Sequence, residues 1–207
     1  MNQKLSKQDR AMPCAARALS FAVALAFQPA LALAAPPALP ASALPSGAQV
    51  TAGQAQISQQ GANLLVQQQS QKLITNWQSF NIGSGASVQF LQPNAQSVAL
   101  NRVVAGDASQ ILGQLRGNGQ VFLVNPQGVV FGQGARVDVG GLVVSSLGIK
   151  DQDFLNGQYR FGAEGAAGGI TNAGELNGRF VVLVAPSLDN SGQIKTADGG
   201  QLALEVG

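Results

Sequence analysis

The sequence contains no histidine and only one cysteine, Cys14, among its 207 residues. Imidazole is therefore unavailable as a general base or metal ligand, and neither a Ser-His-Asp nor a Cys-His catalytic set can be assembled. Zinc and copper sites are disfavoured too, because their usual ligands are histidine nitrogen and cysteine sulfur. We therefore predict no catalytic residues, no metal site, no cofactor and no enzymatic activity.

Charged residues are also scarce, at 11% of the chain, and aromatic residues make up 5%. From Ala35 onward there are eight basic and nine acidic residues, a net charge of −1. No basic stripe is left to contact a phosphate backbone, which argues against nucleic-acid binding. The 26 glycines and the many valines and polar uncharged residues instead favour a turn-rich β protein.

The first 34 residues are typical of a secretory signal peptide. A basic segment precedes the apolar run 18–27, and Ala32-Leu33-Ala34 matches a small-x-small cleavage site. Ten apolar residues are too few to span a bilayer, which needs about 20. Cleavage after Ala34 removes Cys14, so the mature chain has no thiol. Residues 35–47 are rich in proline and alanine and predict an extended linker, which leaves 48–207 as one domain.

Short apolar runs recur about every ten residues from Ser87 onward, separated by Gly, Asn, Gln or Ser. This spacing suits a β-sandwich as well as a β-helix. The C-terminal third favours the β-helix, because the segment 170–176 is echoed by 188–194, and each echo is followed by a similar apolar strand. Asn172 and Asn190 then occupy equivalent corners, where they tolerate left-handed geometry and stack in a hydrogen-bonded ladder. The predicted fold is an all-β parallel β-helix.

A tight turn is predicted between the apolar runs 121–124 and 129–131. Asn at the first position, Pro at the second and Gly at the fourth are the residues that a type I β-turn favours. Both flanking runs are apolar at every position, as in strands covered on both faces. The turn and the residue after it are Asn125, Pro126, Gln127, Gly128 and Val129.

This pentapeptide resembles the Asn-Pro-Asn-Gly-Ile motif in the two-partner (type Vb) secretion domain of filamentous-haemagglutinin-like exoproteins. It differs at the third position and conservatively at the fifth. The similarity extends from Trp77-Gln78-Ser79-Phe80-Asn81-Ile82-Gly83, through 97–103, to Gly141-Leu142-Val143. A second family motif, Asn-Pro-Asn-Leu, is matched only weakly by Gln92-Pro93-Asn94-Ala95.

The resemblance implies a right-handed parallel β-helix with an N-terminal cap and small extra-helical antiparallel sheets. It also implies a secretion module that uses the Sec machinery and is recognised in the periplasm by an outer-membrane transporter with POTRA domains. The module then crosses the pore unfolded and nucleates β-helix folding outside, at the cell surface or in the medium. The partner-binding residues implied are Asn125, Pro126, Gln127, Gly128 and Val129, although a purely structural role for the corner is as well supported.

Three further interpretations follow from the residues. Trp77 and Phe80 are expected to fill the core rather than to form a recognition surface. Asp138, Asp151 and Asp153 are expected in solvated turns, although a carbohydrate-active β-helix with acids on neighbouring coils is the alternative function. The chain stops after a strand without a polar cap, so we expect a C-terminally truncated piece of a longer exoprotein. Adhesion, cytolysis, haem capture or contact-dependent toxicity, and any host-cell or neighbouring-cell contact, then belong to the missing part.

Overall fold

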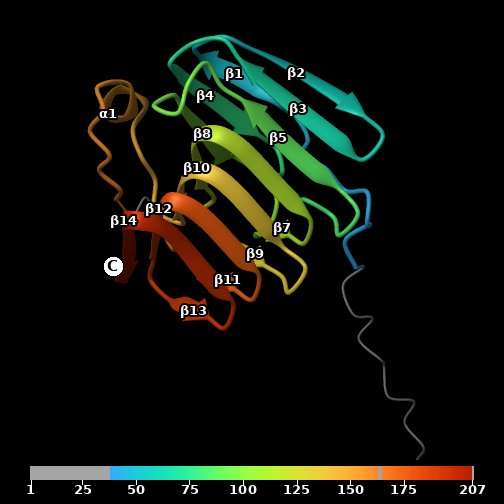
Figure 1. The fold of residues 1–207 in the computed structure, drawn as a ribbon, viewed down its shortest axis with the longest axis vertical. Helices are drawn as coiled ribbons and strands as arrows, with labels where there is room; N and C mark the ends of the chain where they lie inside the picture. Colours follow the sequence, from blue (N-terminus) through green and yellow to red (C-terminus); the bar gives the residue numbers. More distant parts are fainter. Residues whose placement is uncertain (1–37, 163–164, 207) are drawn as a thin grey trace, which may run out of the picture. The chain divides into compact units, whose positions relative to one another are not determined.

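The computed structural model describes residues 38–162 and 165–206. The predicted signal peptide, residues 1–34, lies outside the described residues. The described residues form a coil of strands that pair mainly in parallel, each with its equivalent in the next turn (Figure 1). The predicted parallel β-helix is therefore confirmed, and parallel pairing rules out the antiparallel sandwich. The helix is right-handed and has about six turns.

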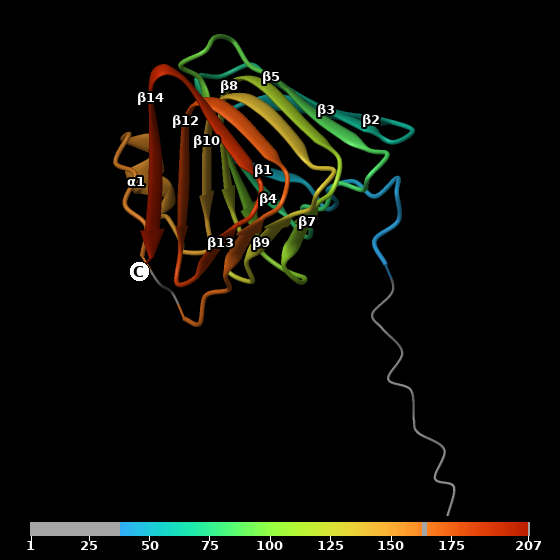
Figure 2. The same ribbon diagram turned by 60° about the horizontal axis from the view of Figure 1, so that its bottom comes forward.

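The coil has three faces, and four long strands bend across two of them. These strands are β8 (Gln114–Val124), β10 (Arg136–Ser145), β12 (Glu175–Ala185) and β14 (Gln193–Val206). Their first halves follow β3 (Asn63–Gln68) and β5 (Ser87–Leu91), and their second halves follow β4 (Lys72–Trp77) and β6 (Val98–Val103). Figure 2 shows the long strands stacked side by side.

The third face is a sheet of four short strands in the order β13-β11-β9-β7. They are β7 (Ser109–Ile111), β9 (Val129–Phe131), β11 (Ile170–Asn172) and β13 (Leu188–Asn190). In β7, β9 and β11 the middle side chain points outward and its two neighbours point inward. The apolar inward residues, Ile111, Val129, Phe131 and Ile170, join the main core, and Leu188 of β13 packs against it. Val129 and Phe131 are fully buried in this core.

An antiparallel cap closes the coil at its N-terminal end. Strand β1 (Gln49–Ala52) pairs antiparallel with β4, and β2 (Ala55–Gln60) forms an antiparallel hairpin with β3. Trp77 and Phe80 fill the core beneath the cap, with ring centroids 5.5 Å apart and each 1% exposed. Their predicted core role is confirmed.

Part of the segment expected to be an extended linker is packed against the coil. The amide of Gly83 donates to the carbonyl of Ala43, and the amide of Ser46 donates to the carbonyl of Ser79. Leu44 packs on the main core. Backbone hydrogen bonds, rather than side-chain periodicity, hold this segment, so its proline-rich composition gave no sign of them.

A second, smaller core lies outside the coil, on the second halves of the long strands. The short helix α1 (Asp151–Leu155) places Phe154 on Phe122, with ring centroids 5.8 Å apart. Lys72 on β4 fixes the helix by donating to the carbonyl of Leu155 at 2.5 Å. No helix in residues 38–162 or 165–206 is long and apolar enough to cross a membrane.

Two local expectations were wrong. Asp138 lies within strand β10 rather than in a turn. Asp151 and Asp153 lie in the first turn of α1 rather than in a loop, where carboxylates interact favourably with the helix dipole. Asn172 and Asn190 lie in paired strands, and every described non-glycine residue has a negative φ. The predicted Asn ladder itself is confirmed, because the side-chain Nδ2 of Asn172 donates to Asn190 Oδ1 at 2.8 Å.

Candidate functional site

The predicted turn connects β8 to β9, at the corner between two faces of the coil. The amide of Gly128 donates to the carbonyl of Asn125 at 2.9 Å, which closes a four-residue β-turn. The Asn125 side chain reinforces it, because Oδ1 accepts from the amide of Gln127 at 2.9 Å. The turn predicted from the sequence is therefore present.

Asn125 also binds the preceding coil. Its Nδ2 donates to the carbonyl of Asp107 at 3.1 Å and to Ser109 Oγ at 3.0 Å. The residue is 1% exposed, so these bonds satisfy an amide that is removed from water. The Asn of the motif therefore ties its own corner to the corner one turn earlier.

The following coil holds the other side of the turn. The amide of Gly168 donates to the carbonyl of Pro126 at 2.7 Å, and the amide of Val129 donates to the carbonyl of Gly169 at 3.2 Å. Gly128 has φ of +98°, and a Cβ atom there would collide with the Gly169 carbonyl. Only glycine fits this position without strain.

The five motif residues divide into two groups by exposure. Asn125, Gly128 and Val129 are buried, whereas Pro126 and Gln127 are exposed. Sequence reasoning placed all five together but missed their supports, Asp107, Ser109 and the Gly168-Gly169 pair. Nothing in the spacing of these supports marked them, because the coil brings them to the turn from neighbouring rungs.

The weak second motif, Gln92-Pro93-Asn94-Ala95, also forms a corner. Gln92 is 6% exposed, and its Nε2 donates to Gln68 Oε1 at 3.1 Å and to the carbonyl of Ser97 at 3.1 Å. Its Oε1 accepts from the amide of Gly119 at 3.0 Å. Gln92, which stands where the family motif has Asn, therefore connects three segments of the chain.

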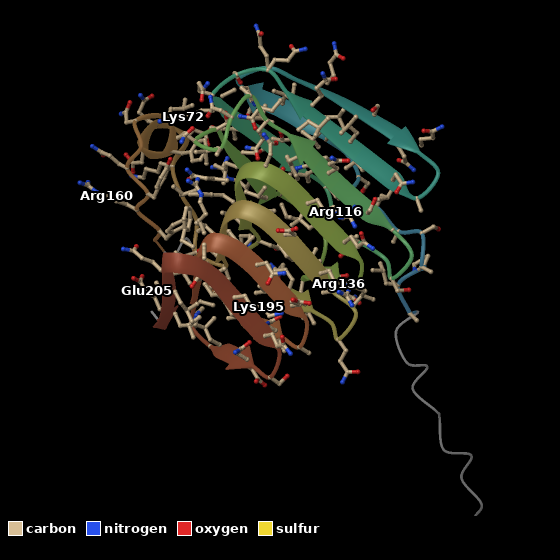
Figure 3. The ribbon with its side chains drawn as sticks, in the orientation of Figure 1. Lys72, Arg116, Arg136, Arg160, Lys195 and Glu205 are labelled. Atoms are coloured by element: carbon tan, nitrogen blue, oxygen red, sulfur yellow. The ribbon has the colours of Figure 1, made fainter. Side chains whose placement is uncertain are left out.

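Charged residues line the face formed by the first halves of the long strands. Figure 3 shows Arg116, Arg136 and Lys195 on this face. Glu175 lies between two of them, 2.5 Å from Lys195 Nζ and 3.7 Å from Arg136. The hydrogen bond from Lys195, with smaller contributions from Asn177 and from both cationic charges, lowers the pKa of Glu175.

The acids of the described strands lie beside basic, polar or apolar residues rather than beside one another. In the strand registers Asp138 lies beside Arg116 and Asn177, and Glu175 lies beside Arg136 and Gln193. No carboxylate of the described strands is paired in register with another carboxylate, and the described residues contain no group of three potential metal ligands. The arrangement of neighbouring acids expected of a carbohydrate-active β-helix is not seen in this part of the chain.

The fold and the corner together define a β-helical module with an antiparallel cap and a motif turn fixed between two coils. The chain belongs to the TPS secretion domain family, whose model matches residues 41–207. It is a secretion module of a two-partner exoprotein. Membership implies an outer-membrane transporter as the second partner, and export of such exoproteins across the outer membrane.

Known relatives agree with this assignment. The crystal structure of the HMW1 secretion domain from Haemophilus influenzae superposes with a TM-score of 0.71 at 30% identity, over 79% of this chain and 45% of that one. A heme/hemopexin-binding protein of H. influenzae strain Rd is 36% identical over 173 residues, which is 79% of this chain and 19% of the relative. Another H. influenzae protein of the same name is 42% identical over 98 residues, 47% of this chain and 11% of the relative. These relatives are known as binding proteins and as a secretion domain.

Proposed function

We propose that residues 1–34 direct Sec-dependent export and are removed after Ala34, and that 48–207 then act as the module that a transporter recognises in the periplasm. Residues 35–47 connect the two. The transporter's POTRA domains bind the module, which crosses the pore and folds at the cell surface or in the medium. The module performs no catalysis.

The exposure of the motif corner carries this proposal. Asn125, Gly128 and Val129 are buried in contacts within the coil, whereas the Pro126 ring and the Gln127 side chain face solvent. The hydrogen bonds that close the turn, from the Gly128 and Gln127 amides to Asn125, lie within residues 125–128, so a partner can read these two side chains before the coil folds outside. The buried three then fix the corner in the folded coil. Both roles of the motif, recognition and folding, are filled by different residues.

Physical chemistry also favours folding as the driving force of export. Each coil that forms outside buries apolar side chains on the preceding coil, and such burial stabilises by about 25 cal/mol per Å². A mature chain without thiols has no crosslink to block a narrow pore. Unfolded segments further supply free backbone groups, which can add as strands to sheet edges of the transporter.

The test compares export and stability of Pro126→Ala and Gln127→Ala in cells that carry the cognate transporter. We expect each variant to reach the medium less efficiently while its melting temperature stays unchanged. Arg160→Ala, an exposed residue near α1, is the matched control and exports normally. Normal export of the Pro126→Ala, Gln127→Ala double variant would contradict recognition through this corner, and equal export without the transporter would contradict the secretion role.

We assign the binding activity named in the relatives to other parts of a longer exoprotein. This chain spans about a fifth of the first relative. Its sequence lacks histidine, a common axial ligand of haem iron. Its lone tyrosine, Tyr159, packs on Phe122 with ring centroids 4.8 Å apart. The module therefore delivers a binding region rather than acting as one.

A further inference from the structure

An apolar row runs along the outside of four neighbouring coils. It consists of Ile74, Leu100, Phe122 and Val143, which pair in register from β4 through β6 and β8 to β10. These side chains belong to the small outer core and not to the main core inside the coil. A bare coil would present the row to water, yet none of the four is more than 5% exposed. Residues 149–159, which contain α1 and which we call the α1 segment, pack on this row.

Polar bonds fasten the α1 segment to two early strands. Arg102 on β6 donates from Nη2 to the carbonyl of Ile149 and to Asp151 Oδ1, both at 2.7 Å. Lys72 on β4, which Figure 3 shows beside α1, donates to the carbonyl of Leu155 and so satisfies an acceptor that the helix end leaves free. Lys72 and Leu155 are 83 positions apart in the chain. The α1 segment therefore connects strands that lie in separate turns of the coil.

The α1 segment depends on the coil for its own structure. Its helix has five residues, whereas an isolated helix needs roughly 12–15 to be even marginally stable. The N-cap residue, Lys150, makes no side-chain hydrogen bond that would start the helix locally. The surface beneath Phe154 is assembled only when β4, β6, β8 and β10 are paired. The α1 segment therefore docks after these four strands have formed their coils.

We propose that the α1 segment is a latch, which closes over these four coils and slows their unfolding. The segment follows β10 and is bonded to β4 and β6, so separating these strands from β10 first requires its release. Contacts that form after the rate-limiting step of folding leave the folding rate unchanged and raise the barrier to unfolding. The inference rests on the proposed function, in which folding outside drives export, and adds that a latched coil resists unwinding toward the pore.

The test measures the folding and unfolding rates of the full chain after jumps in denaturant concentration. Trp77, the single tryptophan of the sequence, is buried in the main core and reports on the coil by its fluorescence. Lys72→Met removes the donor but keeps a side chain of similar length. Its unfolding should become about five-fold faster, while its folding rate changes less than about two-fold. Phe154→Leu should unfold at least about ten-fold faster, again with little change in folding.

A matched control lies in the main core of the coil. Val137 is fully buried, and its register neighbours are Leu115 and Leu176. Because the coil has to form before the latch can close, Val137→Ala should lose stability partly through slower folding, by at least about three-fold. The latch variants and this control therefore differ in which of the two rates changes.

Two kinetic results would overturn the latch and leave the secretion role standing. In the first, Lys72→Met and Phe154→Leu both unfold at the rate of the unchanged chain. In the second, they slow folding as much as Val137→Ala does, which would place the α1 segment in the folding nucleus. If Phe154→Leu fails to fold, the rates of Lys72→Met decide the question, because Lys72 is only partly buried.

Export in cells that carry the cognate transporter links the latch to secretion. The assay temperatures are chosen so that Phe154→Leu and Val137→Ala have the same free energy of unfolding. Phe154→Leu should then yield at least about two-fold less chain in the medium. Equal export of the two variants would overturn the role of the latch in secretion. If the unchanged chain reaches the medium equally well without the transporter, the proposed function itself fails, whatever the unfolding rates are.

Discussion

Replacing Asn125 by alanine removes the side chain that connects two corners of the coil. Three hydrogen bonds disappear: those to the Asp107 carbonyl, to Ser109 Oγ and from the Gln127 amide. Asp107 and Gln127 are exposed, so water can replace their lost partner, whereas Ser109 is 1% exposed and its hydroxyl loses this partner. A buried polar group left without its partner costs about 1–3 kcal/mol. We therefore expect a loss of about 2 kcal/mol.

A domain of this size loses about 2–4 °C in melting temperature for each kcal/mol. Asn125→Ala should therefore melt about 4–8 °C lower, as measured by thermal unfolding followed by circular dichroism. Gln127→Ala is the control on the same turn, because its side chain faces solvent and its substitution changes the free energy of unfolding by no more than about 0.5 kcal/mol.

A double-mutant cycle with Ser109→Ala tests the cause of this loss. If the two side chains act through their shared hydrogen bond of 3.0 Å, the double variant loses less free energy of unfolding than the sum of the single losses, by at least about 0.5 kcal/mol. Strict additivity, or an unchanged melting temperature of Asn125→Ala, would refute the claim that this residue fastens the corner to the preceding coil.

Four other substitutions test the packing of the coil. Gly128→Val forces a β-branched residue into φ of +98° against the Gly169 carbonyl, and the backbone strain alone should lower the free energy of unfolding by about 1–3 kcal/mol in chemical denaturation. Asn172→Ala breaks the bonds to Asn190 and to the Gly174 amide at a site with no exposure, and should cost about 1–3 kcal/mol, whereas Asn190→Ala, at an exposed residue, should cost less. Glu175→Gln tests the lowered pKa of the Glu175 carboxyl. The ion pairs of Glu175 stabilise the fold above the ordinary glutamate pKa and are lost as the pH falls through the lowered pKa. Between about pH 5 and pH 3 the melting temperature of the unchanged chain should therefore fall more than that of Glu175→Gln. Two results would contradict the ion-pair explanation. Either both chains lose the same melting temperature over this pH range, or the difference between them is as large in 1 M salt as in dilute buffer.

The sequence alone was sufficient to predict the class of fold, two equivalent rungs and one turn. The echo between 170–176 and 188–194 predicted equivalent rungs, and the structure pairs Ile170 with Leu188 and Asn172 with Asn190. The turn at Asn125 to Gly128 was predictable because proline and glycine restrict or release backbone angles locally, whatever surrounds them. Trp77 and Phe80 were predictable as core residues because large aromatic side chains gain most from burial.

Other features depended on contacts between rungs. Leu115 and the apolar run 121–124 are separated by five polar or glycine residues, yet β8 continues through Gly117 and Gly119 as one bent strand, because neighbours on both sides supply its hydrogen bonds. Helix α1 was missed because five residues carry too little periodicity, and it exists through the packing of Phe154 on Phe122 and the bond from Lys72.

The amino-acid sequence by itself predicted the position of the motif turn from local backbone preference, and it indicated the family through the resemblance of that turn and its flanking segments. The β-helix followed from the repeat along the chain together with this resemblance. Only the tertiary structure decided that Asn125 and Val129 face inward while Pro126 and Gln127 face solvent, and that residues 149–159 cover an apolar row on four coils. The physical reason is that exposure and proximity at a corner are set by the coils before and after it. Those coils contribute Ser109 and Gly169 from positions that nothing in the motif specifies.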